Sequence, residues 1–151
     1  MKIYIAGPDV FEKNAKEIGQ KYKAICEKYS HTGLYPLDNE CDSSGEIYRG
    51  NIALINEADA VIANGNEFRG EMDTGTAFEI GYAAAKGKKI LVYLSSSATL
   101  VEKYGTEDEN GRLVENFGFP LNLMIAESAE IVYGTFEDCI KKLSSVCAKC
   151  P

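Results

Sequence analysis

Short apolar runs alternate along the chain with longer amphipathic segments, and this alternation limits the fold more than any other feature of the sequence. Apolar runs rich in β-branched and aromatic residues predict strands at 2–6, 34–37, 60–63, 89–94 and 130–133. Apolar residues at helical spacing predict helices at 12–29, 46–57, 73–86, 121–126 and 135–146. Residues 95–118 are the least regular stretch and are predicted to form a surface excursion with a short helix around Leu100.

Strands that alternate with helices in one short chain connect through right-handed crossovers into a parallel sheet. We therefore expect one α/β domain over residues 1–151. Its fold should be a flavodoxin-like or Rossmann-like three-layer sandwich with a sheet of about five strands. Ligands of such sheets bind beyond the carboxyl ends of the strands, where the strand order reverses. The loops at 7–11, 36–45 and 64–76 are then the places to look for a site.

Charge and cysteine content limit the class of partner. Sixteen Lys and Arg against 23 Asp and Glu give a net charge of −7. Nucleic-acid polymers and anionic membranes favour clustered Lys and Arg, so neither is an expected partner. The five cysteines are odd in number and lack the dense spacing of a secreted scaffold, which favours a cytoplasmic location. The terminal pair Cys147 and Cys150 has no second pair or nearby His to complete a zinc site.

The segment 73–87 carries the most informative carboxylates. Asp73 lies where a helix begins, and the helix dipole there favours its ionised form. Residues three and four apart stack on a helix, which predicts one polar face and one packing face. The polar face would hold Gly75, Thr76, Glu79 and Ala83, and the packing face Ala77, Ile80, Gly81 and Ala84. Glu79 would then stand at the border between core and cleft.

Two carboxylates so placed suit glycosidic chemistry, in which one attacks the sugar and the other handles the proton. The alternative is an exposed Glu79 with Asp73 acting only as a helix cap. Neither a GxGxxG fingerprint nor a Walker lysine loop is present, so dinucleotide and triphosphate sites lack their phosphate cradle. Five aromatic residues can wall a base-stacking pocket: Tyr4, Phe11, Tyr35, Tyr48 and Phe68.

Four segments together resemble the nucleoside 2-deoxyribosyltransferases. They are IYIAGPDVF (3–11), YPLDNE (35–40), NIALINEADAVIAN (51–64) and DTGTAFEIGYAAAKGKKILVY (73–93), in the family's order. The most specific part is the Asp that is followed six residues later by Glu in the setting Glu-Ile-Gly-Tyr-Ala. The resemblance implies ping-pong exchange of the base of a 2′-deoxynucleoside through a covalent 2-deoxyribosyl ester, without a metal or organic cofactor. The expected partners are deoxynucleosides and free nucleobases.

The resemblance also implies roles for individual residues. Glu79 matches the nucleophile, Asp73 the acid that assists protonation of the base, and Tyr4 the tyrosine that orients the nucleophile. Asn51 matches a position near the sugar and base that carries Asp in one branch of the family. Asn122, in the segment PLNLM, matches the residue that enters a neighbouring subunit's site and binds the sugar 5′-hydroxyl. A homo-oligomer with sites near a subunit interface is therefore expected.

The first two loops supply four further expected substrate-binding residues, namely Gly7, Asp9, Phe11 and Glu40. Glu40 stands where well-known members carry a Gln that contacts the base, and an ionised carboxylate only accepts hydrogen bonds. This departure leaves the choice between purine and pyrimidine open. The C-terminal SSVCAKCP does not resemble the aromatic tail that closes the site in those members, and 99–117 is longer than their connection.

Two other functions remain open. A related family hydrolyses 2′-deoxynucleoside 5′-monophosphates and needs donors for the phosphate. Asp9 would repel that phosphate, whereas Arg49, Arg69 and Arg112 are possible ligands for it. The third possibility is a non-catalytic nucleotide-binding module in which Glu79 only binds a ribose hydroxyl. The sequence also leaves open how the sugar partitions between transfer to a base and hydrolysis.

Overall fold

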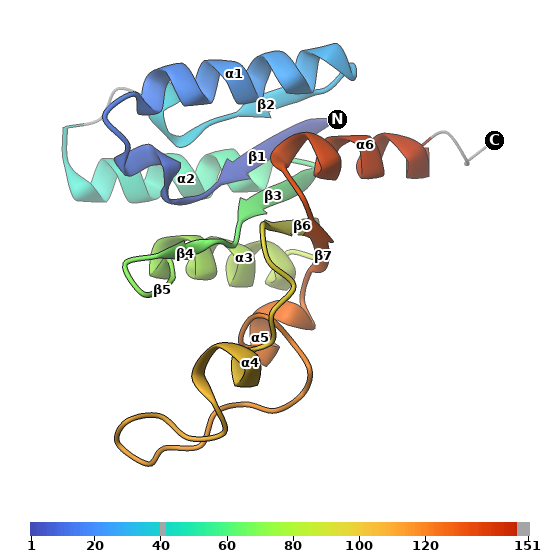
Figure 1. The fold of residues 1–151 in the computed structure, drawn as a ribbon. Helices are drawn as coiled ribbons and strands as arrows, with labels where there is room; N and C mark the ends of the chain where they lie inside the picture. Colours follow the sequence, from blue (N-terminus) through green and yellow to red (C-terminus); the bar gives the residue numbers. More distant parts are fainter. Residues whose placement is uncertain (40–41, 148–151) are drawn as a thin grey trace.

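The computed structural model describes residues 1–39 and 42–147, and its centre is a five-stranded parallel sheet in the order β2-β1-β3-β6-β7 (Figure 1). The strands are β1 (Lys2–Ala6), β2 (Thr32–Leu34), β3 (Ala60–Asn64), β6 (Lys89–Leu94) and β7 (Glu130–Tyr133). The strand order reverses between β1 and β3, as in flavodoxin-like folds. The expected α/β sandwich is confirmed.

Alternation along the strands creates a separate core on each face of the sheet. Ile3, Ile5 and Ile62 face α1 (Ala15–Lys28) and α6 (Phe136–Cys147). On the opposite face, the neighbouring strand residues pack against α2 (Ser44–Glu57) and α3 (Thr74–Ala85); they include Tyr4, Ala6, Val61 and Ala63. Tyr4 therefore points toward α3 because its two neighbours in β1 point the other way.

The second strand lies earlier than the predicted 34–37. It pairs with β1 from Thr32 to Leu34, and the short 3-10 helix η2 (Pro36–Asp38) follows. Pro36 has no backbone N–H and cannot continue the ladder. The Asp38 side chain accepts a hydrogen bond from the Tyr35 backbone N–H (3.0 Å), which closes the turn.

The predicted loop at 64–76 contains a small hairpin that the sequence analysis missed. Its strands are β4 (Glu67–Phe68) and β5 (Glu71–Met72), joined by the two-residue turn Arg69-Gly70. Both turn residues have positive φ, 56° at Arg69 and 93° at Gly70. Positive φ at both positions characterises a type I′ turn, whose twist matches that of the flanking strands.

The predicted excursion after β6 extends away from the sheet, as the yellow-to-orange part of Figure 1 shows. It contains α4 (Leu100–Tyr104) as expected, and α5 (Leu123–Ala126) follows it. The first predicted helix begins later than residue 12, because a 3-10 helix, η1 (Pro8–Phe11), occupies the turn after β1. Among the described residues, no helix is long and apolar enough to cross a membrane.

Candidate active site

A pocket of about 300 Å³ opens beside the segments that follow β1 and β2 and the first turns of α3, next to the point where the strand order reverses. Side chains and backbone from η1, η2, α2 and the start of α3 surround it. We call it the Glu79 pocket. Its lining consists of Gly7, Val10, Phe11, Pro36, Leu37, Asn39, Ile47, Asn51, Asp73, Gly75, Thr76 and Glu79. The position agrees with the rule for ligand sites in open α/β sheets.

The Glu79 carboxylate is held by two hydrogen bonds from other elements. The Tyr4 hydroxyl, which is fully buried in β1, donates to Glu79 Oε1 at 2.6 Å. Asn51 Nδ2 in α2 donates to the same oxygen at 3.4 Å. Within the described part of the chain, no group donates to Oε2. The carboxylate is thus fixed through one oxygen, and the other is available to a ligand.

Burial changes the acid-base behaviour of this pair. It raises the pKa of Glu79 to about 7, and the charge of Asp73 acts in the same direction. The hydrogen bonds from Tyr4 and Asn51 lower that pKa and oppose part of the effect. Burial and the neighbouring Glu79 charge raise the pKa of Tyr4 far above its ordinary value, so its hydroxyl remains a donor. A carboxyl group with a pKa near neutrality in a cleft is typical of catalytic sites.

Asp73 lines the same pocket from the N-terminus of α3. Its Oδ2 accepts hydrogen bonds from the Thr76 backbone N–H and from Thr76 Oγ1, both at 2.8 Å. These bonds make Asp73 the N-cap of α3 and fix the orientation of its carboxylate. Glu79 and Asp73 therefore face one pocket from one helix. This pair can supply a nucleophile and a proton carrier for chemistry at a glycosidic bond.

The other residues predicted from the first loops are placed differently. Gly7 and Phe11 line the pocket, and a Cβ on Gly7 would lie 2.8 Å from Asn64 Cβ, so the close approach requires glycine. Asp9 is not among the lining residues; its Oδ2 accepts a hydrogen bond from Asn64 Nδ2 (3.0 Å) and joins η1 to the end of β3. Glu40 lies outside the described residues.

A protein-family model described as nucleoside 2-deoxyribosyltransferase matches residues 3–124. This match spans most of the chain, including every element that lines the pocket. The chain belongs to the nucleoside 2-deoxyribosyltransferase family.

The chain is similar to three known proteins to different extents. A 2-deoxyribosyltransferase from Leishmania mexicana is similar over 95% of this chain and 97% of its own, with 39% identity and a TM-score of 0.87. An uncharacterized protein of Schizosaccharomyces pombe is 28% identical over 81% of this chain and 74% of its own length. A CMP N-glycosidase from Clostridium botulinum covers 96% of this chain and 99% of its own, with 18% identity and a TM-score of 0.56. The last match shows a shared fold alone.

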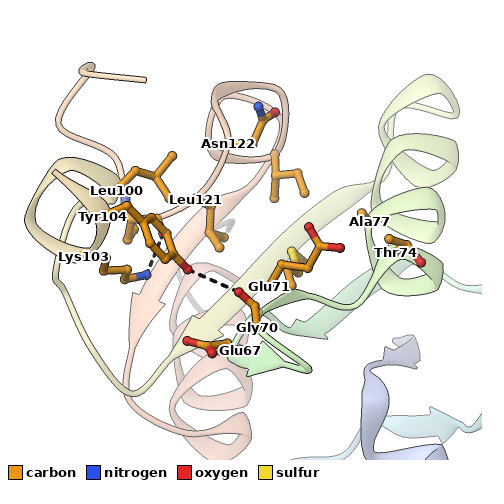
Figure 2. A pocket seen from close by; sticks show the side chains of 14 residues that line it. Glu67, Gly70, Glu71, Thr74, Ala77, Leu100, Lys103, Tyr104, Leu121 and Asn122 are labelled. Atoms are coloured by element: carbon orange, nitrogen blue, oxygen red, sulfur yellow. Dashed lines mark hydrogen bonds between the residues drawn. The ribbon is translucent and has the colours of Figure 1, made fainter. Parts of the chain in front are cut away.

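Asn122 lies in a second hollow, of about 510 Å³, between the β4–β5 hairpin, α3, α4 and α5 (Figure 2). Its Oδ1 accepts from the Met124 backbone N–H (3.0 Å) and caps α5, and its Nδ2 donates to Glu115. The two hollows share no lining residue. Within one chain, Asn122 and Glu79 therefore line different hollows.

Sequence reasoning missed part of the pocket wall. Leu37 and Asn39 line it, although only their loop was singled out, and Ile47 lines it from α2, where no site residue was predicted before Asn51. The predicted faces of α3 are partly correct. Ile80 is buried as expected, but Thr76 and Ala83 of the predicted polar face are buried too, whereas Gly81 of the predicted packing face is exposed. The face of α3 that packs on the sheet is therefore rotated slightly from the face that the small residues indicated. Helical spacing alone does not decide which of two adjacent faces meets the sheet.

No three His, Cys, Asp or Glu side chains within residues 1–39 and 42–147 gather in a way that could hold a metal ion. The polar groups of the pocket are instead carboxylates, amides and a hydroxyl, which are Asn39, Asn51, Asp73, Thr76 and Glu79. Such a set is suited to hydrogen bonding with a sugar and a base.

Proposed function

We propose that this enzyme exchanges the base of a 2′-deoxynucleoside through a covalent 2-deoxyribosyl ester on Glu79. The observation that carries the proposal is the fixed Glu79 carboxylate, bonded to Tyr4 and facing the same pocket as Asp73. In the first step a Glu79 oxygen attacks C1′ of the sugar. The bond from C1′ to the base nitrogen breaks, and its electron pair stays on the base.

Near neutral pH the two carboxyl groups hold about one proton between them. In the reacting state that proton is on Asp73 and Glu79 is ionised, so Asp73 gives the proton that the departing base takes up. In the second step a nitrogen of the acceptor base attacks C1′, the ester bond breaks, and Glu79 leaves again as a carboxylate. The proton of that nitrogen passes to Asp73, which restores the starting state. Two displacements at the same carbon give overall retention of configuration. The same ester is hydrolysed when water takes the place of the acceptor base.

The charge of the pocket favours a nucleoside over a nucleotide as the substrate. A 5′-phosphate needs Lys, Arg or several backbone N–H donors. Of the residues that line the Glu79 pocket in the described part of the chain, none is positively charged. Asp73 and Glu79 would add repulsion. Nucleotide N-glycosidase activity is therefore the second candidate function, and an assay with deoxynucleoside monophosphates tests it.

We also propose that the active enzyme is a homo-oligomer in which Asn122 serves the site of a neighbouring copy. Asn122 and Glu79 lie in separate hollows of one chain. The segment around Asn122 exposes large apolar side chains, with Leu113 85% exposed, Phe117 64% and Met124 73%. Apolar side chains gathered on an extended segment are typical of an interface.

The test is chromatography of the purified protein incubated with thymidine or deoxyinosine, with and without free adenine. We expect deoxyadenosine to appear only when adenine is present, and to be lost in Glu79→Ala. Base release at an equal rate with and without adenine, and no deoxyadenosine, would indicate a hydrolase. Deoxynucleoside monophosphates are then assayed as donors in the same way. Base release from them, with no reaction of either nucleoside, would support the N-glycosidase. Binding without turnover of any donor would indicate a non-catalytic module.

A further inference from the structure

The ring of Phe11, which lines the Glu79 pocket, is held by two side chains of the β4–β5 hairpin. Phe11 and Phe68 stack with ring centroids 5.4 Å apart and planes at 12°. The Arg69 guanidinium lies over both rings, 4.6 Å from the Phe68 centroid and 5.7 Å from that of Phe11. Phe11 is 60% exposed, so its contacts with Phe68 and Arg69 restrain the ring more than burial does.

The backbone of the hairpin favours a small residue where Arg69 lies. Type I′ turns prefer Asn, Asp or Gly at the first central position, because φ is positive there. Arg69 adopts φ 56° nevertheless. A long side chain in this disfavoured conformation is expected only where the side chain itself contributes. Its contact with the two rings is the contribution that the structure contains.

The hairpin is anchored to the rest of the molecule on two sides. The Tyr104 hydroxyl in α4 donates to the Gly70 carbonyl at 3.4 Å, the dashed contact at the centre of Figure 2. At the other end, Met72 packs against the core and is followed directly by Asp73. The position of the Phe68 and Arg69 side chains is therefore fixed relative to the proposed catalytic carboxylates.

We propose that Phe68 and Arg69 are positioning residues that hold Phe11 as a stacking wall for the acceptor base. They thereby set how often the 2-deoxyribosyl ester is taken by a base and how often by water. The inference rests on the proposed function. A nucleobase stacks on an aromatic ring, and a ring that is already fixed loses less freedom when the base binds.

Loosening Phe11 weakens binding of the acceptor base and not of the sugar, because the sugar is covalently attached to Glu79 when the acceptor binds. The acceptor base is held by non-covalent contacts, and a mobile Phe11 weakens them. Water needs no stacking wall: its oxygen attacks C1′, the ester bond breaks, and its proton passes to Asp73. Loosening the stack therefore favours hydrolysis over transfer, without removing any group that takes part in the bond changes.

Two variants test this inference. Arg69→Asn removes the guanidinium and places a residue preferred by the turn, so the hairpin is retained. Phe68→Leu keeps apolar bulk and removes the stacked ring. The matched control is Arg112→Asn, because Arg112 is an exposed arginine on the excursion and does not line the Glu79 pocket.

The assay follows thymidine and adenine, and it quantifies deoxyadenosine, thymine and free deoxyribose separately. For both variants we expect the ratio of transfer to hydrolysis to fall about tenfold and the KM for adenine to rise by a similar factor. Thymine release at saturating thymidine should stay within about twofold of the native rate. The control should keep the native ratio.

An unchanged ratio in folded variants would overturn the inference, and so would an equal loss of transfer and hydrolysis, which indicates a merely structural role. The native enzyme is assayed first, so the two proposals fail in different ways. A native protein that forms no deoxyadenosine contradicts the proposed function. A native protein that exchanges bases while the variants keep its ratio contradicts only the role of Phe68 and Arg69.

Discussion

Glu79 meets two opposing demands, because burial favours its protonated form whereas the proposed attack needs its ionised form. Its pKa of about 7 lies between them. The Tyr4 hydroxyl and the Asn51 amide lower that pKa, since both donate to the ionised carboxylate. These two neighbours therefore determine how much ionised Glu79 is present at neutral pH.

Tyr4→Phe should move the pH profile of the enzyme. Without the phenol donor the pKa of Glu79 rises, so the acid limb of kcat/KM, expected near pH 7, should shift upward by about one unit. The rate should then fall more at pH 6 than at pH 9. Initial rates of thymine release from pH 5 to 9.5 measure this shift. A uniform loss of rate with an unmoved limb would mean that Tyr4 does not act through the ionisation of Glu79.

The raised pKa of Glu79 also predicts how stability depends on pH. The folded state binds a proton at Glu79 up to about pH 7, whereas the unfolded chain releases it near 4.5. The stability that Glu79 contributes is thus present below pH 4.5 and is lost as the pH rises through 7. Glu79→Gln, which is neutral throughout, should be more stable than the native protein at pH 8 by about 2 kcal/mol.

Urea unfolding of the native protein and of Glu79→Gln at pH 5, 6, 7 and 8 measures this difference in stability. The difference in free energy of unfolding should be small at pH 5, because folded Glu79 is then mostly protonated and resembles Gln in shape. It should grow between pH 5 and pH 7 and level off by pH 8. A difference that stays constant across this range would contradict the assigned cause.

At the scale of elements, α3 combines two roles in Asp73. The carboxylate caps the helix through Thr76 and also faces the pocket. Asn caps helices about as well as Asp, so Asp73→Asn should retain the thermal midpoint of the native protein. Exchange should fall by about a hundredfold or more, because Asn carries no proton to the leaving base. Asp73→Ala should in addition lose about 1 kcal/mol of stability. Full exchange in Asp73→Asn would remove Asp73 from proton transfer.

The elements also differ in how well the sequence predicts them. β1, β6 and β7 have their predicted bounds, since each is an apolar run that ends at a change of residue type. β2 was placed too late because the apolar pair Leu34-Tyr35 suggested a strand that Pro36 does not allow. The β4–β5 hairpin was missed because two-residue strands show no periodicity. It depends on the backbone angles of Arg69 and Gly70, which composition does not reveal.

At the scale of the whole molecule, the sequence predicted which loops surround the site but not its complete wall. Ligands of a parallel α/β sheet bind beyond the carboxyl ends of its strands, and the alternating pattern is enough to predict such a sheet and the loops at those ends. Leu37 and Ile47 complete the wall as ordinary apolar residues, which nothing in the sequence distinguishes from core. The separation of Asn122 from Glu79 is likewise a property of the folded excursion and not of any local pattern.

That separation leads to a prediction for mixed oligomers. If Asn122 serves a neighbouring copy, Glu79→Gln and Asn122→Ser are each inactive or weak alone but complement each other. A mixed pair contains one pocket with Glu79 from the Asn122→Ser chain and Asn122 from the Glu79→Gln chain. Ser also caps helices, so α5 is retained in this variant. Random association of equal amounts into two-fold pairs should recover about a quarter of native exchange.

The control for complementation is a mixture of Glu79→Gln with Asp73→Asn. Both changes fall in one pocket of one chain, so no mixed pair has an intact site and no activity should return. Light scattering on the eluted native protein should give a multiple of the 16.5 kDa chain mass. A native mass of one chain at assay concentrations, or no recovery with the Asn122→Ser mixture, would contradict the shared site. Recovery confined to that mixture would assign Asn122 to a neighbouring copy, because activity can return there only if two chains build one site.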